Sequence, residues 1–152
     1  MVVVGDALLP PEVLVNSFAG FARAGWEVAP CWFGPPTLQE LDEQLLLLER
    51  NGPDAVPPPD GLEPLLADAE LVVVHICPVS AALLRRHPHL LAVGVLRAGT
   101  ENVDAAAAQA LGIPVVHTLG RTSEAVSDFA VGLMLAEMRN IARCHAGIRA
   151  GQ

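Results

Sequence analysis

The chain contains no lysine, and its nine basic residues are all arginine. A phosphate-binding loop of the G-x-x-x-x-G-K-[ST] kind is therefore excluded, because that motif depends on its lysine. The formal net charge of −8 argues against nucleic acid or an anionic membrane surface as a partner, since both attract basic proteins. No basic cluster exists beyond the pair Arg85–Arg86.

Cysteine is scarce as well. Cys31, Cys77 and Cys144 are too few and too scattered to build a disulfide framework, which favours a reducing, cytoplasmic location. The apolar start of the chain is far too short for a signal peptide. Apolar runs such as Leu45–Leu48 and Leu71–Val74 fall well below the ~18 residues needed to span a bilayer.

Several catalytic and ligand-binding motifs are absent. The sequence has no G-x-G-x-x-G for a dinucleotide and no G-x-S-x-G for a nucleophilic serine. No histidine or cysteine pair has the C-x-x-C or H-x-x-x-H spacing of a zinc site, so we assign no metal site.

What the chain does contain is a regular alternation of short apolar runs and helical patterns. With 152 residues, 52% hydrophobic and 17% charged, it fits one domain that is densely packed or that covers apolar surface with a partner. Strand–helix alternation at short spacing predicts right-handed crossovers, and hence an α/β, flavodoxin-like parallel sheet of five strands with helices on both faces. The predicted strands are Val2–Val4, Trp26–Cys31, Leu71–Val74, Leu90–Leu96 and Ile113–Val116.

Capping residues mark several helix starts. A helix opening near Pro10-Pro11 is expected to end at Gly25 and to carry an apolar stripe of Val13, Phe18, Phe21 and Ala22. A helix is predicted at Leu38–Arg50, with Thr37 and Glu40 forming a capping box. The remaining helices are predicted at Leu62–Ala69, at Ser80–Arg86, at Asp104–Leu111 with Asp104 as its cap, and from Ser123, also as a cap, to about Cys144. The Pro-rich segment 51–61 is interpreted as a surface loop, with a hinge or ligand lid as the alternative.

Three turns that follow predicted strands carry most of the polar chemistry: His75–Ser80, Arg97–Asn102 and His117–Ser123. In a parallel sheet the carboxyl ends of the strands share one edge, so these turns are expected to meet at one cleft. Gly99 would let a ligand approach the backbone closely enough for main-chain amides to hold a carboxylate.

Each of these residues also has a structural interpretation. Gly99 and Gly120 are ordinary turn residues if nothing binds there, and Arg97 could pair with Glu101 or Asp104. A histidine that follows a strand is often a hydrogen-bonded rim residue, and this applies to His75 and His117. Cys77 lies between apolar residues and Pro78, which favours packing over nucleophilic chemistry.

The stretch LRAGTENVD…GIPVVHTLG…SEAVSDFAVGLMLAEMRN resembles the D-isomer-specific 2-hydroxyacid dehydrogenases, the family of phosphoglycerate dehydrogenase. The resemblance covers nearly the whole chain and is most specific at Arg97–Asp104, Gly112–Val116 and Ser123–Asn140. It implies that residues 1–121 are a flavodoxin-like substrate-binding domain. Residues 122–152 would be a long helix leading to a Rossmann domain that this chain lacks.

The resemblance also implies roles for individual residues. The turn of Arg97, Ala98 and Gly99 would grip the substrate carboxylate through main-chain amides, and Thr100 would reach toward the nicotinamide end of the cofactor. The loop matching His75–Val79, including Cys77, would line the substrate pocket. NAD or NADP would be bound mainly by the absent domain, and the family's catalytic Arg, Glu and His lie there too, so no catalytic residue is assigned to this chain.

Two departures from the family pattern bear on the substrate. The sequence R-A-G-T-E-N-V-D is two residues shorter than the common R-A-G-T-G-V-D-N-V-D, and the loop from His75 lacks the basic residue that phosphoglycerate-specific members use. A phosphorylated substrate is therefore not favoured. We expect the substrate-binding part of an oxidoreductase that acts on the CH–OH group of a small D-2-hydroxy acid. A stand-alone flavodoxin-like binding module is the alternative.

The helix expected from Ser123 to Cys144 spreads apolar residues around most of its circumference, whereas a helix lying on one sheet needs only a single stripe. Its extra apolar surface is expected to pack against the cofactor domain or against a second copy of the chain. The resemblance implies the same partner, a homodimer formed through this helix.

Overall fold

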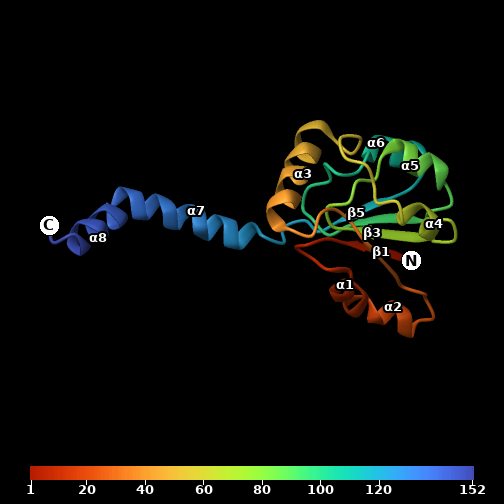
Figure 1. Cartoon of the computed structure of the whole chain (residues 1–152), viewed down its shortest axis with the longest axis horizontal. Helices are drawn as coiled ribbons and strands as arrows, with labels where there is room; N and C mark the ends of the chain where they lie inside the picture. Colours follow the sequence, from red (N-terminus) through yellow and green to blue (C-terminus); the bar gives the residue numbers. More distant parts are fainter. The chain divides into compact units, whose positions relative to one another are not determined.

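The computed structural model describes all 152 residues and contains one sheet of five parallel strands (Figure 1). The strands run in the order β2-β1-β3-β4-β5, which is the flavodoxin-like order and confirms the predicted fold class. The strands are β1 Val2–Gly5, β2 Ala29–Trp32, β3 Leu71–Val74, β4 Ala92–Val95 and β5 Val115–His117.

Three predicted strands begin too early, those expected from Trp26, Leu90 and Ile113, and backbone hydrogen bonds explain the first and the last. The amide of Trp26 donates to the carbonyl of Phe21, so the chain is still completing a helical turn where strand β2 was expected. The amide of Ile113 likewise donates to Ala108 at the end of the preceding helix, and Pro114 has no N–H to offer a neighbouring strand. The regular pairing of β2 therefore starts at Ala29 and that of β5 at Val115.

The helices of the first unit cover both faces of the sheet, with α1 and α2 on one face and α3, α4, α5 and α6 on the other (Figure 1). Along β1 the side chains alternate, so Val2 and Val4 join the larger apolar core while Val3 joins the smaller core with Leu14 of α1. These helices are α1 Pro11–Ser17, α2 Ala19–Arg23, α3 Leu38–Asn51, α4 Leu62–Leu66, α5 Ala81–Arg86 and α6 Ala105–Ala110.

The predicted helix caps at Thr37 and Asp104 are confirmed, and Ser80, which was predicted as the first residue of its helix, is a cap as well. Each side chain accepts a hydrogen bond from the backbone amide three residues further along the chain. The capping box differs in one detail, because the carboxylate of Glu40 accepts from the Thr37 hydroxyl at 2.5 Å. In the expected arrangement it would reach the Thr37 backbone amide.

The first helix was predicted incorrectly in two respects. It is interrupted at Phe18, which separates α1 from α2. The predicted apolar stripe is also not the buried one, since Val13 is 47% exposed and Phe21 38% exposed, while Leu14 is buried. Phe21 packs edge-to-face on Phe18 and Trp26 at the margin of the smaller core.

A polar clamp joins α4 to the end of α5. The carboxylate of Glu63 accepts hydrogen bonds from the Arg86 guanidinium and pairs with Nε2 of the buried His87 at 2.9 Å. The hydrogen bond from Arg86, followed by the one from His87, lowers the pKa of the Glu63 carboxyl below its usual value. The clamp holds both short helices over the same face of the sheet.

The chain divides into two compact units, Met1–Leu119 and Gly120–Gln152. The second unit consists of α7 Ser123–Met138 and α8 Ile141–Arg149. The single helix predicted from Ser123 to Cys144 is therefore wrong. Asn140 adopts a left-handed conformation with φ of 54°, which breaks the helix, and asparagine is one of the few residues that tolerate this.

The predicted cap of the second unit is also wrong. Ser123 is the first residue of α7, and Thr122, which precedes it, makes no side-chain capping bond. None of the helices combines the length and the apolar character that crossing a membrane requires.

Candidate functional site

Polar residues follow four of the five strands at the carboxyl edge of the sheet. Asp6 comes directly after β1, His75 after β3 and Thr118 after β5, while Arg97 lies two residues beyond the end of β4. Since every strand pair is parallel, these residues lie at the same edge, as the sequence predicted. The turns after β4 and β5 are joined directly, because the amide of Thr118 donates to the carbonyl of Arg97 at 3.0 Å.

Asp6 and His75 form a polar pair at this edge. Asp6 is fully buried, and its Oδ1 accepts hydrogen bonds from the amides of Leu8 and Leu9 at 3.0 and 3.1 Å. Its Oδ2 lies 2.8 Å from Nδ1 of His75, whose side chain is 12% exposed. The sequence did not single out Asp6, because one aspartate after a strand is typical of any turn and its partner lies 69 residues away.

Asn102 ties two of the predicted site loops together. It is fully buried, and its Nδ2 donates to the carbonyl of Cys77 at 3.0 Å and to that of His75 at 3.4 Å. The amide of Val79 donates to the carbonyl of Asn102 at 2.8 Å, so the two loops are bonded in both directions. This residue was also missed, although an asparagine inside a turn that faces another turn is a usual sign of such a bridge.

Cys77 belongs to the apolar core. Its side chain is fully buried, and burial raises the pKa of its thiol well above the usual value. A thiol that stays protonated is a poor nucleophile, so the packing interpretation holds for this side chain. Any contact of Cys77 with a ligand would have to come from its main chain.

Arg97 pairs with a residue that the sequence did not suggest. Its Nη2 donates to Oε1 of Glu49, near the end of α3, at 2.6 Å. The partners considered from the sequence were Glu101 and Asp104, and Asp104 instead accepts from the amide of Ala107 at the start of α6. The side chain of Arg97 is only 16% exposed, and its Nη1 is buried without a hydrogen-bond partner.

The turn of Ala98, Gly99 and Thr100 leaves its main-chain donors free. None of these three amides donates a hydrogen bond to another group of the chain. The carbonyls are used instead, since that of Ala98 accepts from Nδ1 of His117 at 2.6 Å and that of Thr100 accepts from the amide of Val103 at 2.9 Å. Consecutive unpaired amides form an anion-binding concavity, which suits a carboxylate.

A carboxylate of the chain already lies beside this turn. A Cβ atom added to Gly99 would meet the side chain of Glu101, with Oε1 at 2.5 Å and Cδ at 2.7 Å. Space next to Gly99 is therefore available to a carboxylate, and the close approach requires a residue without a side chain.

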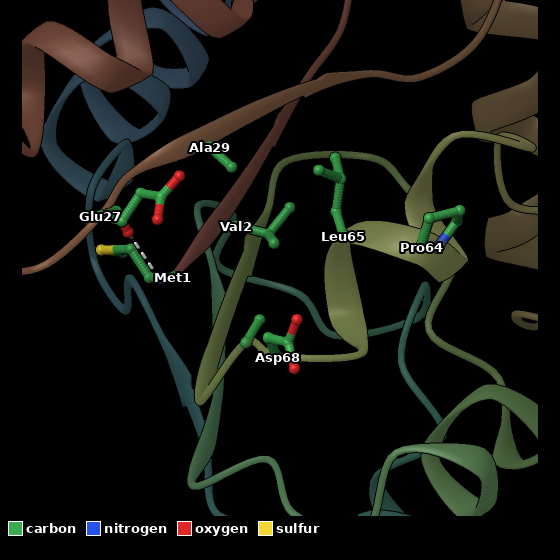
Figure 2. Close-up of a pocket in the computed structure, with 8 residues that line it drawn as sticks. Met1, Val2, Glu27, Ala29, Pro64, Leu65 and Asp68 are labelled. Atoms are coloured by element: carbon green, nitrogen blue, oxygen red, sulfur yellow. Dashed lines mark hydrogen bonds between the residues drawn. The ribbon is translucent and has the colours of Figure 1, made fainter.

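Two cavities of the structure lie away from this turn. One, of about 220 Å³, is at the amino ends of β1 and β2 beside α4, where the amino group of Met1 donates to the carbonyl of Glu27 (Figure 2). The other, of about 630 Å³, lies between α6 and the start of β5. No three His, Cys, Asp or Glu side chains gather to hold a metal.

Comparison with known proteins finds a matching family and several proteins of similar sequence. The family model described as "D-isomer specific 2-hydroxyacid dehydrogenase, catalytic domain" matches residues 36–147. Glycerate dehydrogenase of Methylorubrum extorquens is 34% identical over 93 residues, which are 61% of this chain and 30% of that protein. Hydroxypyruvate reductase of Thermotoga maritima is 30% identical over 94 residues, which are 61% of this chain and 31% of that protein.

Solved structures with the same fold are more distant in sequence. NAD-dependent formate dehydrogenase of Staphylococcus aureus aligns with a TM-score of 0.62 at 17% identity, covering 100% of this chain and 43% of that one. D-lactate dehydrogenase of Aquifex aeolicus, solved with NAD and lactic acid, aligns with a TM-score of 0.61 at 18% identity, covering 99% and 37%. All four proteins are more than twice as long as the part that this chain matches.

Proposed function

Because the chain belongs to the D-isomer specific 2-hydroxyacid dehydrogenase family, we propose that it is the substrate-binding part of an NAD(P)-dependent oxidoreductase that acts on the CH–OH group of D-2-hydroxy acids. Its task is to hold the carboxylate of a small 2-hydroxy or 2-oxo acid at the carboxyl edge of the sheet. The free cysteines are compatible with a cytoplasmic setting.

The observation that carries this proposal is the row of unpaired amides at Ala98, Gly99 and Thr100, inside the matched region. Three further polar atoms at the same edge, Nη1 of Arg97, Oδ1 of Asn102 and Oγ1 of Thr118, are buried without partners. Buried polar atoms normally have partners, so a polar ligand would satisfy what the chain leaves open. A stand-alone binding module is less favoured, because the model of a dehydrogenase family matches residues 36–147, which include this turn.

The residues of this chain do not fit a dinucleotide. In a dinucleotide-binding fold the amides of the first strand–helix turn hold the pyrophosphate. Here the corresponding amides, those of Leu8 and Leu9, already donate to Oδ1 of Asp6. We therefore propose that NAD or NADP is bound outside these residues, with Thr100 as the one residue of this chain that approaches its nicotinamide end.

The 152-residue chain is expected to bind a 2-hydroxy acid without oxidising it. Adding D-glycerate should shift the NMR amide signals of Ala98, Gly99 and Thr100, whereas acetamide, which lacks the carboxylate, should not. No NADH should form when NAD is also present, as followed by absorbance. Turnover by the chain alone, or glycerate-induced shifts confined to other parts of the sheet, would contradict the proposal.

We also propose that the partner is a second copy of the chain, bound through the second unit. No residue of α7 or α8, the two helices of this unit, is buried. Large apolar side chains of α7, among them Phe129 at 68% exposure and Met138 at 73%, alternate with small residues such as Ala130 and Gly132. An apolar surface of this kind drives association, and two-fold dimers are the commonest result.

Charging this surface is expected to dissociate the dimer. Phe129→Glu would place a carboxylate in an apolar interface, which should weaken self-association on the order of a hundredfold, equivalent to about 3 kcal/mol. Sedimentation of the unmodified chain at micromolar concentration should show dimers and that of the variant monomers. Leu91→Glu, at a residue of the first unit that is 58% exposed, is the matched control and should stay dimeric. A monomeric unmodified chain would exclude this partner.

A further inference from the structure

The pair of Asp6 and His75 lies at the point of the sheet where ligands bind in this topology. In the order β2-β1-β3-β4-β5, the chain extends the sheet first to one side of β1 and later to the other. The crevice at such a switch point, between the carboxyl ends of β1 and β3, is the preferred ligand site of open α/β sheets. Asp6 follows β1 and His75 follows β3, so the pair flanks this crevice.

The hydrogen bonds of Asp6 determine which ring nitrogen of His75 carries the hydrogen. An ionised carboxylate accepts hydrogen bonds and cannot donate one, so Nδ1 of a neutral imidazole must donate to Oδ2 of Asp6. Nε2 is then an acceptor. It has no partner within the chain and is not among the buried unpartnered atoms, so it is accessible from solvent.

Nε2 of His75 follows the strand next to the turn that would hold the carboxylate, so it suits a group on the third carbon of a 2-hydroxy acid. Strands β3 and β4 are neighbours, and neighbouring strands lie about 4.8 Å apart. This spacing is short enough for a ligand whose carboxylate is held by the turn of Ala98, Gly99 and Thr100 after β4 to place its third carbon beside the end of β3. The main chain of His75 is fixed there by Asn102.

We propose that Asp6 is a positioning residue that holds His75 with Nε2 as an acceptor, and that this pair selects a 2-hydroxy acid with a hydroxyl on its third carbon over one with a second carboxylate or a phosphate. The hydroxyl donates to Nε2, whereas an anionic group has no hydrogen to donate and meets the nearby Asp6 charge. This inference rests on the proposed function, because it places the substrate carboxylate at the turn after β4.

Asp6→Asn separates the positioning role from a structural one. The carbonyl of the new amide can still accept from Leu8 and Leu9, which leaves its NH₂ group facing Nδ1 of His75. The imidazole must then carry its hydrogen on Nε2. In ¹⁵N NMR at alkaline pH, where the imidazole is neutral, Nδ1 of His75 should give the signal of the protonated ring nitrogen in the unmodified chain. In the variant, Nε2 should give that signal.

Ligand preference should change with the tautomer. The unmodified chain should bind D-glycerate better than 2-hydroxymalonate, and Asp6→Asn should shift this ratio toward 2-hydroxymalonate by about tenfold. The matched control is Thr37→Val, which removes the cap of α3 and so costs stability without touching the pair. It should leave both the ring signals and the ratio unchanged.

The outcomes distinguish a failure of the proposed role of Asp6 from a failure of the proposed function. An unmodified chain with its hydrogen on Nε2, a variant with unchanged ring signals, or an unchanged ratio would overturn the role of Asp6 while leaving the carboxylate site intact. Failure of both acids to shift the amides of Ala98, Gly99 and Thr100 would instead overturn the proposed function. The expected ring-signal exchange together with the shifted ratio would support both.

Discussion

Gly5→Ala is expected to destabilise the first unit by about 3 kcal/mol, the upper end of what overpacking usually costs. A Cβ atom at Gly5 would meet the carbonyl oxygen of Leu9, the nitrogen of Pro11 at 2.5 Å and Cδ of Pro11 at 2.8 Å. These are atoms of the backbone and of a ring fused to it, so no side chain can rotate away. The turn after β1 would have to open to accommodate the methyl group.

Chemical denaturation of the chain, followed by circular dichroism, measures this loss as a lower midpoint with an unchanged slope. Gly61→Ala is the matched control, since a Cβ atom there meets nothing within 4 Å, and it should change the free energy of unfolding little. A Gly5→Ala variant as stable as this control would show that the close approach of Leu9 and Pro11 is not required.

The same turn shows why the pairing of Asp6 with His75 could not be predicted from the sequence. The amide of Asp6 donates to the carbonyl of Leu9, and its side chain binds the amides of Leu8 and Leu9, all of which a local pattern suggests. The bond to His75 depends on β1 and β3 becoming neighbours, which no spacing along the chain encodes. Glu49 and Arg97 meet for a similar reason, because α3 ends near the turn after β4.

The elements that were predicted well are those determined by local chemistry. The apolar run Leu71–Val74 is buried on both faces of the sheet and was placed with its correct ends. The caps at Thr37 and Asp104 were also correct, because a capping bond spans only three residues.

The break at Asn140 could not be predicted in this way. Neither Pro nor Gly marks it, and the segment Glu137–Ile141 has a pattern that a continuous helix would tolerate. In the structure the amide of Cys144 donates to the carbonyl of Asn140, so α8 begins anew from this residue. Asparagine permits the left-handed conformation without requiring it, and the choice is made by the surrounding chain.

Gly99→Val is expected to abolish binding of D-glycerate while leaving the first unit folded. The bulk of valine would occupy the approach to the amides of Ala98, Gly99 and Thr100, so their bonds to the ligand carboxylate could not form. Hydrogen bonds to a charged group contribute about 1.5–3 kcal/mol each, and losing one corresponds to roughly a ten- to a hundredfold weaker affinity. NMR titration of the variant with D-glycerate measures the loss.

Stability should respond quite differently at Gly99 and at Gly5, although both residues would suffer a close contact. At Gly99 the obstructing group is the carboxylate of Glu101, the far end of a flexible and exposed side chain that can rotate into solvent. Gly99→Val should therefore unfold at nearly the same denaturant concentration as the unmodified chain. Glu101→Gln removes the negative charge beside the turn without changing the size of the side chain, so it should preserve glycerate binding. A Gly99→Val variant that binds glycerate normally would reduce this glycine to an ordinary turn residue. A variant that fails to fold would show that the turn is held more rigidly than the free amides indicate.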